Sequence, residues 1–194
     1  MAAWIKILYG DEIDENLSHC LELAETPHGT VDNVMRIHSL RPSTMIGHVK
    51  LYKAVLHDDK NVLPKWFQET VSSYVSILNN CDYSLKNHWA NACHLLNDKN
   101  KSDMIYDALR ARKPYVFFVG YELEILNYAE KLTLYPSEIS QNDIDRLRKS
   151  GLDDGEILEA NQIVCYFNYA NRLINGLGVT TEGDTIGYYN DNGK

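Results

Sequence analysis

Apolar side chains recur at intervals of three and four residues along most of this chain, a spacing that places them on one face of an α-helix. The segment from Trp66 to Leu78 shows the pattern clearly, with Val71 and Val75 between its ends. Alternation of apolar and polar residues, which is typical of a half-buried strand, is nearly absent. The sequence therefore predicts an all-α fold.

Proline, glycine and capping residues divide this pattern into separate predicted helices. A helix is expected to end before Pro42, because proline disfavours helical geometry in the preceding residue, and Pro64 suits the first turn of another helix. Ser140 and Asp153 each begin a segment with capping-box spacing. We expect helices near residues 12–24, 31–38, 42–56, 64–78, 81–96, 103–110, 117–132, 140–151 and 153–176.

The chain length indicates one domain. With 194 residues, of which 44% are hydrophobic, the chain can form a core without metal or disulfides. We expect a single helical domain over residues 1–179 and a C-terminal tail or arm over residues 180–194, which are rich in Gly and Asp. A weak match of 66–69 to 156–159 suggests two weakly related helical halves.

Charge and cysteine usage limit the partners and the location. The net charge of −8 would repel nucleic acid and anionic membranes, so neither is expected as a partner. The segment Met1–Leu8 does not resemble a signal peptide, and no stretch approaches the roughly 18 apolar residues of a membrane span. The four cysteines are dispersed and none forms a C-x-x-C pair. We expect a cytoplasmic protein with free thiols.

Four residues form the candidate site. Cys81, Ser84 and His88 follow each other at intervals of three and four residues and so share one helical face. Asn80 is expected to cap this helix, and Cys81 in its first turn would have a lowered thiol pKa. His88 can exchange a proton at neutral pH, and a buried Glu69 on a strip of small serines could orient it. Each residue also has an ordinary structural interpretation in a core or on a surface.

The same four residues resemble a known family signature. The pattern Glu69, eleven residues, Cys81-Asp-Tyr-Ser84, three residues, His88 is similar to the E-x11-C-x-x-C-x3-H signature of the AhpD-like and carboxymuconolactone decarboxylase superfamily. Serine replaces the second cysteine. Further segments resemble the uncharacterised peroxidase-related branch of that superfamily, namely 29–33, 38–42, 48–52 and 152–178.

The resemblance implies an all-α fold, homo-oligomers, and a site without metal or other cofactor. It also implies reduction of alkyl hydroperoxides by two thiols that cycle through a disulfide, with the cysteine nearer the histidine as the attacking group. Ser84 occupies that position, and a hydroxyl forms neither a sulfenic acid nor a disulfide. The usual two-thiol cycle therefore cannot run unchanged.

Three functional hypotheses remain open. The first is a thiol-dependent oxidoreductase that reduces a peroxide-like small molecule with Cys81 and an external thiol reductant. The second is a decarboxylase-like or isomerase-like enzyme that uses Glu69 and His88 as acid and base. The third is a non-catalytic oligomeric binding protein. The sequence ranks the peroxidase-related hypothesis first because of the resemblance.

Other marked residues fit structural roles better. His38 and His48 are ten residues apart across Pro42, which is not a recognisable metal-ligand spacing. Cys93 lies twelve residues, about 18 Å of helix, beyond Cys81 and cannot form a disulfide with it. Cys81 is accordingly predicted to be the most reactive of the four thiols.

Overall fold

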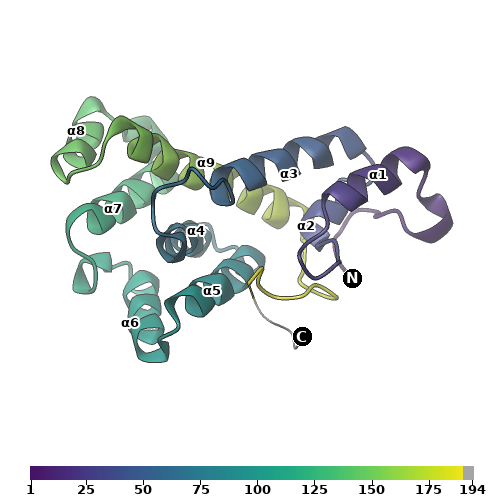
Figure 1. Ribbon diagram of the computed structural model, residues 1–194, viewed down its shortest axis with the longest axis horizontal. Helices are drawn as coiled ribbons and strands as arrows, with labels where there is room; N and C mark the ends of the chain where they lie inside the picture. Colours follow the sequence, from purple (N-terminus) through teal and green to yellow (C-terminus); the bar gives the residue numbers. More distant parts are fainter. Residues whose placement is uncertain (190–194) are drawn as a thin grey trace.

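The computed structural model describes residues 1–189, and most of them are helical (Figure 1). The absence of strands from residues 1–189 confirms the all-α prediction. Short 3-10 helices occur at Gly10–Glu12, Pro114–Val116 and Pro136–Glu138. The α-helices are α1 (Glu15–Leu23), α2 (Asn33–Arg36), α3 (Pro42–Leu56), α4 (Lys65–Leu78), α5 (Asp82–Leu96), α6 (Lys99–Arg110), α7 (Gly120–Leu134), α8 (Gln141–Lys149) and α9 (Asp154–Leu177).

Local capping explains where these helices begin. Both predicted capping boxes are confirmed: Ser140 pairs with Asp143 at the start of α8, and Asp153 pairs with Glu156 at the start of α9. Helix α6 begins four residues earlier than predicted, because Asp98 accepts a hydrogen bond from the backbone of the first turn. The predicted relation between two helical halves stays a prediction, since α9 is continuous where α4 and α5 are separated by a turn.

Helix α4 lies at the centre of the fold and packs against α5, α7 and α9 (Figure 1). Every residue from Phe67 to Ile77 is buried. Three of these residues are serines whose hydroxyls each donate to the carbonyl four residues earlier, which satisfies their polar atoms within the helix; they are Ser72, Ser73 and Ser76. As the sequence predicted, these small side chains share the helix with a buried Glu69.

Backbone hydrogen bonds join the first residues of the chain to the C-terminal end of α9. The backbone of Trp4 donates to the Leu177 carbonyl, and Thr180 donates to the Ala2 carbonyl. Between them Gly178 ends α9 with a φ of +59°, and a Cβ there would lie 2.1 Å from the Trp4 ring. Glycine thus supplies both the left-handed turn and the space that this junction requires.

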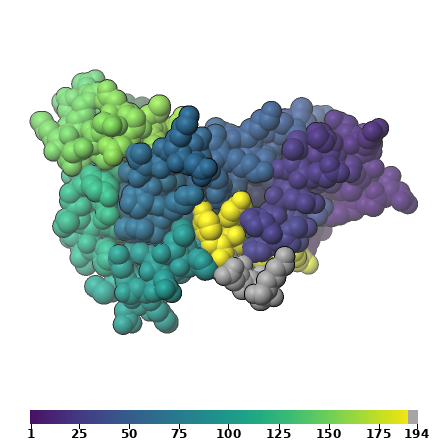
Figure 2. All heavy atoms as spheres, viewed as in Figure 1, coloured from purple at the N-terminus to yellow at the C-terminus, as the bar shows by residue number. Residues whose placement is uncertain are grey.

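Beyond this junction, residues 179–189, here called the C-terminal strap, return across the domain. Figure 2 shows the strap in yellow at the surface, between α5 and the indigo segment that leads into α2. The Asn33 side chain donates to the carbonyls of Thr180 and Glu182, while its backbone donates to Asp184. The predicted tail is therefore packed on the domain over residues 180–189; its remainder, 190–194, lies outside the described residues.

Among residues 1–189, no helix is both long enough and apolar enough to cross a bilayer.

Candidate functional site

Glu69 of α4 and His88 of α5 form a buried hydrogen-bonded pair. Glu69 Oε2 lies 2.6 Å from His88 Nδ1, and the Glu69 side chain is only 2% exposed. Asn91, one turn beyond His88, donates from its amide to Glu69 Oε1 at 3.2 Å. The Phe167 ring lies edge-on to the imidazole, with centroids 4.5 Å apart. The pair is therefore fixed in position and orientation by its neighbours.

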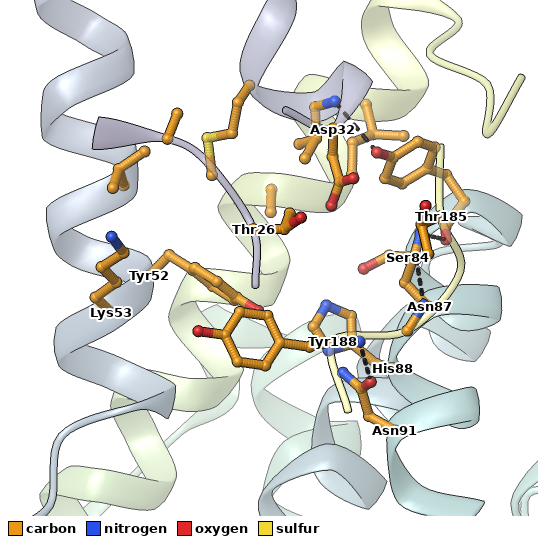
Figure 3. Close-up of a pocket in the computed structure, with 18 of the residues that line it drawn as sticks. Thr26, Asp32, Tyr52, Lys53, Ser84, Asn87, His88, Asn91, Thr185 and Tyr188 are labelled. Atoms are coloured by element: carbon orange, nitrogen blue, oxygen red, sulfur yellow. Dashed lines mark hydrogen bonds between the residues drawn. The ribbon is translucent and has the colours of Figure 1, made fainter. Parts of the chain in front are cut away.

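His88 and Ser84 line a cavity between α3, α5, α9 and the strap (Figure 3). The space open to the centre of a water molecule is about 80 Å³, several times the roughly 10–15 Å³ that one water needs. Aromatic and polar residues dominate its wall, among them Thr26, Asp32, Tyr52, Asn87, Asn91, Tyr166, Phe167, Thr185 and Tyr188. The cavity suits a small molecule with both polar and apolar parts.

The C-terminal strap forms one wall of this cavity. The backbone of Gly187 donates to Asn87 Oδ1 at 3.2 Å, and the backbone of Tyr188 donates to Asn91 Oδ1 at 2.6 Å. Asn91 therefore contacts both Glu69 and the strap, which connects the buried pair to the cavity wall. The Tyr188 ring packs on the His57 ring with centroids 4.4 Å apart.

Cys81 does not have the environment predicted for it. It is the N-cap of α5 itself, and Asn80 instead adopts a left-handed conformation with a φ of +51°. Backbone N–H groups of the first turn favour the thiolate, but desolvation is stronger and raises the Cys81 thiol pKa to about 11. The residue is 1% exposed and packs among apolar side chains such as Ala3 and Ile37. The prediction of a lowered pKa is therefore wrong.

The other cysteines are separate from the site. Cys20 is buried, Cys93 is half-buried, and Cys165 is exposed on α9. Burial raises the thiol pKa of Cys93 and also that of Cys165. Exposure therefore identifies Cys165, rather than Cys81, as the thiol most open to reagents.

His38 and His48 belong to a buried hydrogen-bond chain that ends at the cavity. His38 Nε2 lies 3.0 Å from His48 Nδ1, and His48 Nε2 lies 2.9 Å from the Tyr166 hydroxyl. Burial lowers the pKa of His48 to about 4, so the ring is neutral near pH 7. Within residues 1–189, no cluster of His, Cys, Asp or Glu has the arrangement of a metal site.

Several cavity residues escaped the sequence analysis. Asn91 follows Ser84 by seven residues and His88 by three, so extending the helical stripe by one turn would have found it. Asp32 precedes the short helix α2, and Tyr188 belongs to the strap. Nothing in the local pattern around either residue indicates that the fold brings it to His88.

Comparisons with known proteins identify the fold. No protein family matches the sequence, and no curated protein matches it. Solved structures are similar, including an uncharacterised peroxidase-related protein with an alkylhydroperoxidase AhpD core from Ralstonia eutropha, at 18% identity over 95% of this chain and 94% of that one, with a TM-score of 0.78. An uncharacterised peroxidase-related protein from Silicibacter sp. is 20% identical over 94% of this chain and 93% of that one, with a TM-score of 0.78.

A third similar structure has a named activity. It is the debrominase Bmp8, solved as a cysteine-to-alanine variant in complex with 2,3,4-tribromopyrrole, at 15% identity over 91% of each chain and a TM-score of 0.71. The chain thus has the AhpD-like all-α fold that the sequence resemblance implied.

Proposed function

We propose that this AhpD-like, peroxidase-related protein is an enzyme in which the Glu69–His88 pair moves protons on a small molecule bound in the cavity. The observation that carries the proposal is the 2.6 Å contact between Glu69 Oε2 and His88 Nδ1, with the His88 ring at the cavity wall (Figure 3). A carboxylate that holds Nδ1 leaves Nε2 as the nitrogen available for proton transfer.

The proposed chemistry begins with a neutral His88. Nε2 accepts a proton from a substrate carbon or hydroxyl, and the Glu69 carboxylate stabilises the imidazolium that forms. In an isomerisation the proton returns to a neighbouring substrate atom. In a decarboxylation CO₂ leaves, and the protonated His88 supplies the proton that replaces it. Neither reaction needs an oxidant or a reductant.

The environment of the thiol favours this hypothesis over the thiol cycle. The Cys81 pKa of about 11 leaves very little thiolate near pH 7, and Cys81 is not among the cavity-lining residues. Ser84 does line the cavity, but its hydroxyl cannot carry out the redox steps. The acid–base pair is thus better placed to act on a ligand than the thiol.

Proton transfer can be tested directly in D₂O. The protein is incubated with a panel of small lactones, keto acids and aminoketones, and exchange or conversion of each compound is followed by NMR. We expect turnover that falls by about 10²–10⁴ in Glu69→Gln and His88→Gln. The control is Asp59→Asn, which changes an exposed side chain outside the cavity. Turnover that persists in both pair variants, or no turnover across the panel, contradicts the proposal.

Thiol-dependent reduction of an alkyl hydroperoxide remains a second candidate. It is supported by the names of the two peroxidase-related structures and by the three-residue spacing of Cys81 and Ser84 on one helical turn. In this cycle an external thiol would complete the disulfide chemistry that Ser84 cannot. Peroxide consumption by the unchanged protein with dithiothreitol, abolished in Cys81→Ala, would favour it. If neither reaction occurs, a non-catalytic binding protein is the remaining hypothesis.

A further inference from the structure

The carboxyl group of Asp32 is directed into the cavity, and one of its oxygens has no hydrogen-bond partner within residues 1–189. Asp32 is the N-cap of α2, yet its side chain does not cap that helix. Its Oδ1 atom is buried and forms no hydrogen bond within residues 1–189. Figure 3 shows the carboxyl oxygens pointing into the cavity toward the side on which His88 lies. A desolvated carboxylate without a donor is costly, so this position favours a ligand that supplies one.

The charged groups around Asp32 form their hydrogen bonds elsewhere, and so does Lys53 on the cavity wall, whose Nζ donates to the Leu23 carbonyl at 3.1 Å. His28 Nε2 lies 3.0 Å from the Gly187 carbonyl, and Arg36 Nε donates to the Val31 carbonyl at 2.9 Å. The neighbouring acid, Asp184, accepts hydrogen bonds from the Tyr83 hydroxyl and from the Asn33 backbone. Asp184 therefore has its own donors, whereas Asp32 Oδ1 has none in the part of the chain that the structure describes.

The histidine chain makes the Tyr166 oxygen a further hydrogen-bond acceptor. Thr44 donates its hydroxyl proton to the Arg41 carbonyl, so it accepts from His38 Nδ1 at 2.7 Å. A neutral His38 must then accept at Nε2 from His48 Nδ1. His48 Nε2 accepts in turn from the Tyr166 hydroxyl. The phenol proton is committed to His48, and the lone pairs of the Tyr166 oxygen remain for a ligand.

His88 adds a third acceptor by the same reasoning. Its Nδ1–H donates to Glu69, so Nε2 of the neutral ring carries a lone pair. The rings of Tyr52 and Tyr188 border the same space (Figure 3). Aromatic rings attract cations electrostatically. Acceptors and aromatic rings together fit a ligand that is rich in hydrogen-bond donors and positively charged.

We infer that the cavity binds a compact organic ammonium ion, whose N–H groups donate to Asp32 and whose apolar part lies against Tyr52 and Tyr188. The inference rests on the proposed function in that it names the substrate class of the same cavity. This binding involves no covalent step, because the carboxylate and the ammonium group interact only through charge and hydrogen bonds.

Titration calorimetry with three probes of similar shape tests this inference. Benzylamine, benzyl alcohol and benzoate are compared at about pH 7.5, where the amine is protonated and Asp32 is ionised. We expect benzylamine to bind at least about tenfold more tightly than either of the other probes. Asp32→Asn should remove this difference, whereas Asp59→Asn, an equal change on an exposed residue outside the cavity, should preserve it.

The inference can be tested even if Asp32→Asn fails to fold, because the affinities of the unchanged protein for the three probes already show which charge it prefers. Preference for benzyl alcohol or benzoate, binding of none of the probes, or unchanged benzylamine affinity in a folded Asp32→Asn variant overturns it. Proton transfer that depends on Glu69 and His88 without amine binding would leave the proposed function intact and reject only the ligand class. Amine binding without turnover would support the ligand class and reject only the proposed function.

Discussion

Cys81 and Ser84 lie within one turn at the start of α5, yet only Ser84 lines the cavity. The difference arises because Cys81 is the N-cap and packs between the N-terminal segment, α9 and the strap, whereas Ser84 lies on the face that carries His88. The position to which the family resemblance assigns the attacking thiol therefore lines the cavity but carries a hydroxyl.

We expect Ser84→Cys to create peroxide reduction with dithiothreitol at a rate well above that of the unchanged protein. The new thiol would lie one turn from His88, which can take its proton, and three residues from Cys81, a spacing at which redox pairs form disulfides. Peroxide consumption measures the rate. Adding His88→Ala should lower it by about 10²–10⁴. The control is Ser43→Cys on the exposed start of α3; an inactive Ser84→Cys variant whose two thiols do form a disulfide would contradict the prediction.

Cys165 should be the first thiol to react with an alkylating reagent near neutral pH. It is exposed, whereas Cys81 is 1% exposed and has a pKa of about 11. Mass spectrometry of briefly labelled native protein can assign the modified residue, and labelling in denaturant gives the reference for complete access. Modification of Cys81 in the native protein ahead of Cys165 would show that the α5 N-terminus opens readily.

Asp32→Asn should stabilise the fold while it weakens amine binding. Desolvation raises the Asp32 pKa to about 6 from an ordinary 3.8, with a further contribution from the charge of Asp184, while the positive charge of Arg36 opposes the rise. A raised carboxyl pKa means that folding favours the protonated form, so stability is full below about pH 3.8 and falls as pH increases through about 6.

At about pH 7.5 the variant should gain about 1–2 kcal/mol of unfolding free energy, and the gain should disappear near pH 4. Urea denaturation at the two pH values measures both quantities. Asp59→Asn serves as the control, because its side chain is exposed. Equal stabilities of Asp32→Asn and the unchanged protein at both pH values would contradict the prediction.

His48 should remain neutral and keep its proton on Nδ1 well below the pH at which an ordinary histidine titrates. Burial is the main cause of its pKa of about 4. Nitrogen chemical shifts distinguish the two tautomers and can be followed from about pH 8 to pH 5. Tyr166→Phe should perturb Nε2 alone, since that atom accepts the phenol proton. Titration of His48 near pH 6.5 would disprove the assigned direction of the chain.

The chain is expected to form at least a dimer, as the family resemblance implies. Met104 of α6 and Val116, which lies between α6 and α7, are exposed apolar side chains that border one hollow of the surface. Exposed apolar side chains that lie together are more often covered in an assembly than left in water. Light scattering at micromolar concentration measures the mass. A monomer at that concentration would contradict the expectation.

The sequence predicts local features of this protein much better than distant ones. The periodicity around Val71 and the capping boxes at Ser140 and Asp153 depend on neighbours within one or two turns, and the structure confirms both the helices and the caps. The spacing of Ser84 and His88 likewise placed them on one face. Helical periodicity is enough to establish these features.

The features that the sequence did not predict depend on contacts between distant parts of the chain. The sequence indicates that a helix begins beside Cys81. The burial of the Cys81 thiol, however, depends on Ala3 and Val179, which lie far away along the chain. The position of Asp32 depends on how α2 docks, and that of Tyr188 on the path of the strap. Desolvation is a property of the assembled fold, so it cannot be obtained from spacing.

The attachment of the strap has a consequence for how such cavities diverge. Asn87 and Asn91 hold the strap by its backbone N–H groups, which every residue except proline possesses. These two hydrogen bonds therefore do not depend on the side chain at position 188, which forms part of the cavity wall. Evolution can exchange this side chain and reshape the ligand space without loosening the scaffold. Chains that share this fold at only 15–20% identity can thus come to bind different ligands while they keep the same arrangement of helices.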